Sequence, residues 1–136
     1  MAGQTKDAGF QLGVRKTFQG NQVDVWNFLI SGEGIRIWLG LIEPDHLIPG
    51  QPFTLNSGIE GEITVLKLQS HLRMRWRKKK WKNTSRLQLR VIPTGRNKTV
   101  VAFHQEKLQG PEQREQMKKH WKKVIFRLGQ ALSDRH

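Results

Sequence analysis

Cysteine and tyrosine are both absent from this sequence of 136 residues. Without cysteine the chain can form no disulfide, no thiolate metal site and no thiol nucleophile, and this composition suits a reducing cytoplasm. Without tyrosine it has no phenol to polarise a ligand carbonyl. Acidic residues are scarce, with 11 Asp and Glu against 24 Lys and Arg, which gives a net charge of +13. These absences predict a strongly basic cytoplasmic protein.

Long apolar runs are also missing. No stretch approaches the length of a membrane span, and the opening segment MAGQTKDAG lacks the charged-then-apolar build of a signal peptide. We therefore expect a soluble protein with no membrane span. The length fits one domain over residues 1–136, with an ordered core at about 8–132. The ends, 1–7 and 133–136, are expected to be flexible.

Patterns typical of catalysis or metal binding are not found. The five histidines show no zinc-type spacing, no Gly-rich phosphate loop follows a predicted strand, and no serine lies in a nucleophile elbow. Glu60 and Glu62 lie two residues apart and could act as an acid/base pair, but a hydrated strand edge explains them better. We therefore expect no catalytic residues, no metal ligands and no cofactor.

The last third of the chain carries two different periodicities. Apolar and polar residues alternate through 87–92 and again through 99–104, and the segment 93–97 between them holds Pro and Gly. This pattern predicts a β-hairpin. After Gly110 the apolar residues recur every three or four positions, at Met117, Trp121, Val124, Ile125, Leu128 and Leu132. That spacing predicts one long amphipathic helix.

The first two thirds predict a strand, two short helices and further strands. Asn21 is a candidate N-cap for the first helix, which Ser31 and Gly32 should end. The remaining elements are expected as a strand over 10–17, a second helix over 35–39, a loop over 44–52 and strands over 53–55, 59–65 and 72–77. This order predicts the α+β class, with one sheet face covered by helices.

Several short motifs, in this order, resemble the START-like (SRPBCC) helix-grip superfamily. The group that the chain resembles within it is the one similar to the C-terminal domain of the activator of heat-shock protein 90 ATPase. The motifs are Val25-Trp26, Trp38, Gly58-Ile59-Glu60-Gly61-Glu62, Leu72-x-Met74-x-Trp76, Ser85-x-Leu87, Thr99-x-Val101-x-Phe103 and Met117-x-x-x-Trp121. Together they span about residues 8–132.

The resemblance implies a helix-grip (START/Bet v-like) fold, in which a curved antiparallel sheet wraps around a long C-terminal helix. It also implies a cavity between them that receives an apolar small molecule. The candidate ligand-binding residues are Trp26, Trp38, Met74, Trp76, Leu89, Val101, Phe103, Gln105, Met117, Trp121 and Ile125. Cyclase or aromatase-type activity follows only by analogy with the superfamily.

Gln105 is the one polar group expected to face inward among these candidates. A buried amide needs hydrogen-bond partners from protein, water or ligand. Many relatives carry histidine at the position of Gln105, whereas this chain has His104 one residue earlier. By strand alternation His104 should face away from Phe103.

Positive charge is concentrated in the second half of the chain. Residues 63–136 hold 20 basic and 4 acidic side chains, whereas residues 1–62 hold 4 and 7. A candidate basic surface consists of Arg73, Arg75, Arg77, Lys78, Lys79, Lys80 and Lys82. Lysines between the apolar positions of the last helix add a second cluster. Such a field attracts acidic proteins or nucleic acid, or is simply solvated.

Three hypotheses about function remain open at this point. The first is binding of an apolar or aromatic small molecule between sheet and helix. The second is an interaction domain that docks on a chaperone or another acidic protein through its basic outer face. The third is polyanion or nucleic-acid binding by residues 73–82, with Trp76 expected to be buried and Trp81 free to stack on a base.

Overall fold

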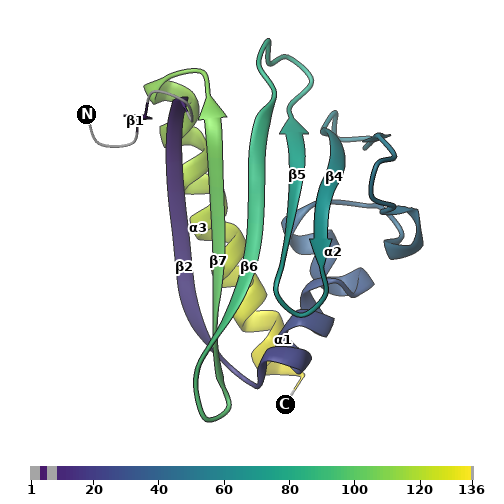
Figure 1. Ribbon diagram of the computed structural model, residues 1–136, viewed down its shortest axis with the longest axis vertical. Coiled ribbons are helices and arrows are strands. Elements are labelled where there is room, and N and C mark those ends of the chain that lie inside the picture. The colour runs from purple at the N-terminus through teal and green to yellow at the C-terminus, as the bar shows by residue number, and fades with distance from the viewer. Residues whose placement is uncertain (1–3, 6–8, 136) are drawn as a thin grey trace.

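The computed structural model describes residues 4–5 and 9–135. These residues form eleven elements, in the order β1 (Gln4–Thr5), β2 (Gly9–Gln19), α1 (Gln22–Leu29), α2 (Gly32–Trp38), the 3₁₀ turn η1 (Pro44–His46), β3 (Phe53–Thr54), β4 (Glu60–Lys67), β5 (His71–Arg77), β6 (Ser85–Gly95), β7 (Lys98–Leu108) and α3 (Pro111–Asp134). The predicted α+β order is confirmed (Figure 1).

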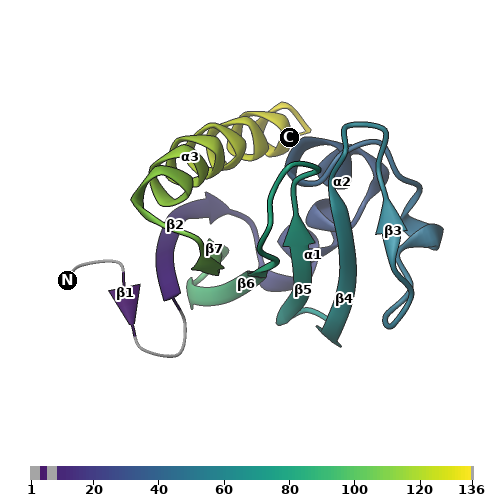
Figure 2. The same cartoon turned by 90° about the horizontal axis from the view of Figure 1, so that it is seen from above.

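The strands of the described residues form one antiparallel sheet in the order β1-β2-β7-β6-β5-β4-β3. The first long strand, β2, therefore pairs with the last, β7, and the meander β4 to β7 extends from there. The sheet is curved, and α3 lies across its concave side (Figure 2). This is the helix-grip arrangement that the family resemblance implied.

Helix α3 is held by the apolar stripe that its sequence predicts. The buried positions of the helix are Met117, Trp121, Val124, Ile125, Leu128 and Leu132. Pro111 opens the helix, where a missing backbone N–H costs nothing. The lysines between the stripe positions are largely exposed, which leaves a charged outer side on α3. None of the helices in the described residues combines the length and the apolar character needed to cross a bilayer.

Helices α1 and α2 are short and follow one another almost without a linker. The Asn21 side chain accepts a hydrogen bond from the backbone N–H of Asp24 at 2.9 Å, so the predicted N-cap is confirmed. Ser31 caps α2 in the same way by accepting from Gly34 N–H at 3.2 Å. Gly34 itself is buried against the last turn of α1. The two helices share the concave side of the sheet with α3.

The β6–β7 hairpin differs from its prediction in the length of the turn. The break was expected over residues 93–97, but β6 continues through Pro93 to Gly95, and only Arg96 and Asn97 turn the chain. The ladder shifts register between Pro93 and Gly95, and such an irregularity tolerates a proline without an N–H. Asn97 has a φ of 57°, a left-handed conformation that Asn adopts readily.

Regular structure reaches further at both ends than the expected core of 8–132. Gln4–Thr5 pairs with β2, and α3 continues to Asp134. The guanidinium of Arg135 lies 3.4 Å from Glu33 Oε1 and 5.2 Å from the centre of the Phe28 ring, which holds this end against α1 and α2. Residues 1–3, 6–7 and 136 of the ends expected to be flexible lie outside the described residues.

Candidate functional site

The residues predicted to line a cavity all lie on the concave side of the sheet, and all are buried. They come from α1, α2, α3 and the inner positions of the strands β5, β6 and β7. None is more than 5% exposed: Trp26, Trp38, Met74, Trp76, Leu89, Val101, Phe103, Gln105, Met117, Trp121 and Ile125. Hollows of about 180 to 590 Å³ open at the surface of the described residues, and other side chains line them. The eleven residues form a packed core, and their ligand-binding role stays a prediction.

Aromatic rings fill the centre of this core. Trp121 stacks on Phe103 with 4.7 Å between ring centroids and 15° between planes. Trp76 lies 6.1 Å from Trp121, and Trp38 lies 6.3 Å from Phe103. These spacings are those of favourable aromatic pairs. The helix and the sheet therefore meet through direct ring contacts.

Gln105 faces inward as the strand alternation predicted, and its amide is satisfied by protein. Its Nε2 donates to Ser85 Oγ at 2.9 Å, and its Oε1 accepts from Trp121 Nε1 at 2.8 Å. The Ser85 hydroxyl donates in turn to the Trp76 carbonyl at 2.6 Å. This chain of bonds ties β5, β6 and β7 to α3. Two buried donors, Trp26 Nε1 and Trp76 Nε1, have no acceptor among the described residues.

The basic run 73–82 divides among three places. Arg73, Arg75 and Arg77 lie on the outer face, which we define as the face of the sheet opposite α3. Lys78 turns toward α3, and Lys79 packs beside Gly58 in the turn before β4. The strand alternation predicted the face on which the arginines lie. It did not predict that Lys78 and Lys79 point to different parts of the molecule.

The expectation that Trp81 is free to stack on a base is wrong. Trp81 is only 8% exposed, and its ring packs edge-on against Trp76 at 5.3 Å between centroids. Residues 78–84 form the connection between β5 and β6, and the indole covers the end of the core there. Burial of its large apolar surface outweighs the polar character of its lysine neighbours.

One end of the outer face is neutralised by ion pairs. Arg86 Nη1 lies 2.7 Å from Glu106 Oε1, and Arg75 Nη1 lies 3.8 Å from Glu62 Oε1. Arg77 pairs in the same way with Glu60. Both glutamates considered as an acid/base pair are thus engaged by arginines. Among the described residues, no group of His, Asp or Glu side chains is arranged to hold a metal ion.

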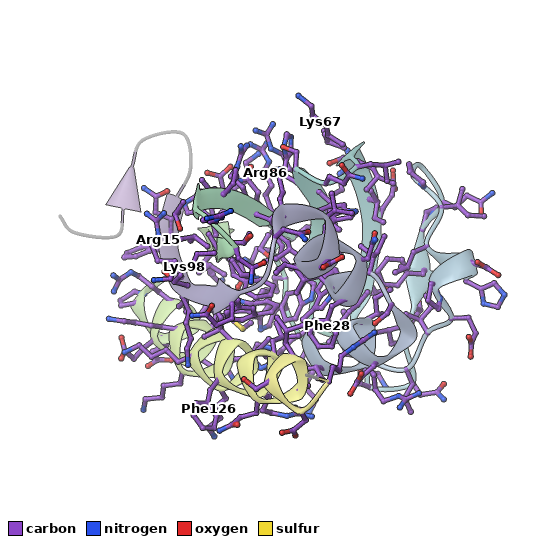
Figure 3. The ribbon with its side chains drawn as sticks, turned by 90° about the horizontal axis from the view of Figure 1, so that it is seen from below. Arg15, Phe28, Lys67, Arg86, Lys98 and Phe126 are labelled. Carbon is purple, nitrogen blue, oxygen red and sulfur yellow. The ribbon has the colours of Figure 1, made fainter. Side chains whose placement is uncertain are left out.

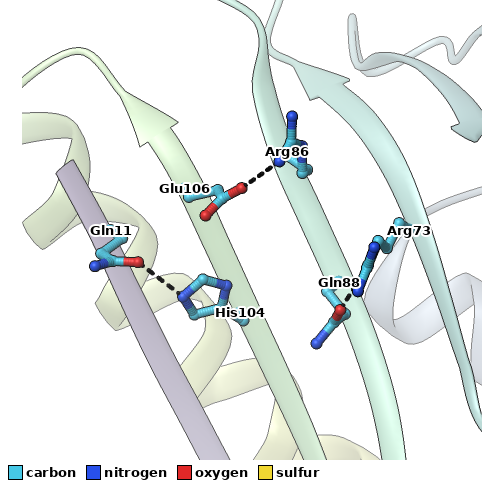
Figure 4. Close-up of polar contacts among 6 residues, drawn as sticks. All are labelled: Gln11, Arg73, Arg86, Gln88, His104 and Glu106. Atoms are coloured by element: carbon cyan, nitrogen blue, oxygen red, sulfur yellow. Dashed lines mark hydrogen bonds and ion pairs between the residues drawn. The ribbon is translucent and has the colours of Figure 1, made fainter. Parts of the chain in front are cut away.

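The middle of the outer face lies beside the Arg86–Glu106 ion pair and carries further polar contacts between side chains. Arg73 Nε donates to Gln88 Oε1 at 2.8 Å, and His104 Nε2 lies 3.1 Å from Gln11 Oε1 (Figure 4). His104 thus faces away from Phe103, as the alternation predicted. A shallow hollow of about 270 Å³ is lined here by Arg73, Arg86, Gln88, His104 and Glu106.

The other end of the outer face carries a row of basic residues from different strands. The register pairs Lys67 with His71, His71 with Arg90, Arg90 with Ala102, and Ala102 with Arg15. We call Lys67, His71, Arg90 and Arg15 the basic row. Directly opposed residues lie about 5 Å apart at their Cβ atoms. The row therefore crosses five strands, with Ala102 of β7 between Arg90 and Arg15. Lys67 and Arg86 extend from the side opposite α3 (Figure 3).

The positive charge of the basic row affects the pKa of His71. Loss of hydration lowers the pKa of the His71 imidazole, and the positive charges of Arg90, Arg73 and Lys67 lower it further. Among the described residues, neither Arg73 nor Arg90 has a carboxylate within salt-bridge distance. Lys67, Arg90 and Arg15 were not among the residues predicted to form the basic surface. Alternation places each on a face, but only the strand register brings them together.

Comparison with known proteins agrees with this architecture. The sequence model of the family described as Activator of Hsp90 ATPase homolog 1-like protein matches residues 21–133. No curated protein matches the chain.

Among solved structures, CalU16 from Micromonospora echinospora superposes with a TM-score of 0.78 at 21% identity, over 95% of this chain and 79% of that one. PFC0360w, an HSP90 activator from Plasmodium falciparum, superposes with a TM-score of 0.76 at 17% identity, over 92% of this chain and 97% of that one. The Aha1 dimer from Colwellia psychrerythraea superposes with a TM-score of 0.70 at 14% identity, over 90% of this chain and 95% of that one. All three share the fold described here.

Proposed function

The chain belongs to the Activator of Hsp90 ATPase homolog 1-like family, and from that membership and its surface charge we propose that it is an interaction domain for an acidic protein partner. The partner would dock on the outer face of the sheet. The observation that carries this proposal is the basic row, with Arg73 beside it, on a face that is not covered by any helix of the described residues.

The paired strands hold the charged side chains of this face on a rigid backbone. Each residue of the basic row is anchored on a hydrogen-bonded strand, so little backbone ordering is required when a partner binds. Uncompensated charge also steers an oppositely charged protein toward the face and speeds association at low salt. The paired end, where Glu60, Glu62 and Glu106 lie, would set the orientation of the partner by repelling its acidic groups.

An HSP90 chaperone is the first partner to test. One protein with the same fold, PFC0360w, carries the description of an HSP90 activator. The likeness to that protein is one of fold, so the interaction of this chain with a chaperone rests on the proposal and on its own charge. An acidic surface on the chaperone would be the complement of the basic row.

Reversal of charge at Arg73 and Arg90 should weaken binding of an HSP90 chaperone by about tenfold or more. Both guanidinium groups lack a described carboxylate partner, so the variant Arg73→Glu/Arg90→Glu breaks no ion pair within the fold. The affinity of the purified proteins can be measured by biolayer interferometry at low and at physiological salt. Wild-type affinity should fall as salt is added.

The matched control is Lys119→Glu/Lys123→Glu, which changes net charge equally on exposed positions of α3. This variant should bind the chaperone within about twofold of wild type, because its charges lie on the other side of the sheet. Equal losses in both variants would mean that net charge alone drives association. Unchanged binding by the Arg73→Glu/Arg90→Glu variant would reject the outer face as the docking site.

Binding of an apolar or aromatic molecule in the core is the second candidate function. The observation that favours it is the pair of buried indole N–H groups of Trp26 and Trp76 that have no described acceptor. A buried donor without a partner is unfavourable by roughly 1–3 kcal/mol, and a ligand carbonyl or hydroxyl could supply the acceptor. The packed rings around Trp121 would have to part to admit such a molecule.

If the core holds a ligand, organic extraction of the purified protein should release one apolar compound in about equimolar amount, detectable by mass spectrometry. The compound should raise the melting temperature when added back, since a ligand stabilises the folded state that binds it. A control extraction of the denatured and refolded protein should release none. Extracts without a stoichiometric compound would count against this candidate and leave the docking proposal intact.

A further inference from the structure

A second basic region lies away from the outer face, where the connection after β5 meets α3. A hollow of about 590 Å³ opens there, and we call it the lysine hollow. Its lining consists of Lys78, Glu112, Glu115, Gln116, Lys119, His120 and Lys123. Lys119 and Lys123 stand one turn apart on α3, so both project to the same side of the helix. Lys78 reaches the hollow from the connection between β5 and β6.

The imidazole of His120 lines the lysine hollow. The ring packs edge-on against Trp121 at 4.6 Å and lies 6.4 Å from Trp76. Burial lowers the pKa of His120 to about 4, and the charges of Lys78, Arg127 and Lys123 contribute to the decrease. His120 is therefore neutral at physiological pH and can offer a ring N–H to a bound group without adding charge.

The cations of the hollow are not neutralised by carboxylates. Among the described residues, none of Lys78, Lys119 and Lys123 has a carboxylate oxygen within 4.0 Å, although Glu112 and Glu115 line the same hollow. Three ammonium groups around one concave site repel each other. A bound anion with several charges would relieve that repulsion and accept hydrogen bonds from all three.

We propose that the lysine hollow binds a compact anion that carries two or more phosphate groups. A volume of about 590 Å³ accommodates a small molecule of this kind. A nucleic-acid strand fits less well, because Trp81, the aromatic side chain of the adjacent lysine-rich connection, is buried and offers no base a surface to stack on. A strand that ran past the hollow would also meet the carboxylates of Glu112 and Glu115.

The probe for this site is inorganic tripolyphosphate, titrated into the whole protein by isothermal calorimetry at low salt. Wild type should bind one tripolyphosphate, and Lys119→Gln/Lys123→Gln should lose about tenfold or more in affinity, since each lysine removed deletes a charge-assisted hydrogen bond. The matched control Arg73→Gln/Arg90→Gln loses the same charge from the outer face and should bind within about twofold of wild type.

A second readout follows the His120 ring by NMR. Saturation with tripolyphosphate should raise the pKa of His120, because the anion offsets the charges of Lys78, Arg127 and Lys123 that lower it. Orthophosphate should raise it less at equal concentration. No binding, equal loss of affinity in both variants, or an unmoved His120 titration at saturation would overturn the proposal. So would an oligonucleotide that binds more tightly than tripolyphosphate and depends on Lys119 and Lys123.

Discussion

Replacement of Trp121 with alanine should destabilise the fold by about 4 kcal/mol, the largest loss expected for a single side chain in this protein. The change empties the ring position that stacks on Phe103 at 4.7 Å and borders Trp76. It also removes the donor to Gln105 Oε1, which would be left buried without that partner. A domain of this size is stable by roughly 5–15 kcal/mol, so urea denaturation should show a large decrease in the midpoint.

Trp121→Phe separates the two contributions. Phenylalanine keeps a ring against Phe103 but has no N–H for Gln105, so it should lose about 1–3 kcal/mol and fall between wild type and Trp121→Ala. Were Trp121→Ala to cost less than about 1 kcal/mol, the concave side would not be packed as described. That result would instead favour a core that opens readily to a ligand.

Gly34→Ala should be the second most damaging substitution, with a loss of about 3 kcal/mol or more. A Cβ at this position would lie 2.1 Å from the carbonyl oxygen of Phe28 and 2.9 Å from that of Leu29. Both are backbone atoms in the last turn of α1, so relief requires the two helices to separate. Thermal unfolding followed by circular dichroism would measure the effect.

Gly32→Ala is the matched control, because it lies in the same helix two residues earlier. An added Cβ at Gly32 meets no atom within 4 Å. Alanine restricts the unfolded chain more than glycine does, so this variant should be neutral or more stable by up to about 1 kcal/mol. Similar losses at both positions would show that helix propensity, and not the contact between α1 and α2, decides the stability here.

Local patterns in the sequence were sufficient for the elements and for the inward or outward direction of most side chains. The stripe of α3, the N-cap at Asn21 and the inward Gln105 all depend on periods of two or 3.6 residues, which a reader can count. The hairpin turn was misjudged because Pro93 is a strong breaker signal, and only the register irregularity around it shows why the strand continues.

The surface sites could not be predicted because they depend on which strands are neighbours and in which register. Nothing in the local sequence of Lys67 or Arg15 connects the two, although they belong to one line across the sheet. In the same way, Lys78 was grouped with its sequence neighbour Arg77, whereas it shares a hollow with Lys119 of α3. Burial of Trp81 likewise depends on a partner, Trp76, that faces it across the end of the core.

The basic row also disfavours pairing of the strands in a shifted register. A shift of one residue in the register of a strand exchanges its two faces, so it would carry Arg90 or Arg15 into the aromatic interior and a core residue out to water. Burial of an unpaired guanidinium is among the most unfavourable changes a fold can suffer. A chain folded in a slipped register would therefore be both unstable and unable to present the row. A partner that binds the basic row would therefore bind only copies of the protein whose strands pair in the correct register.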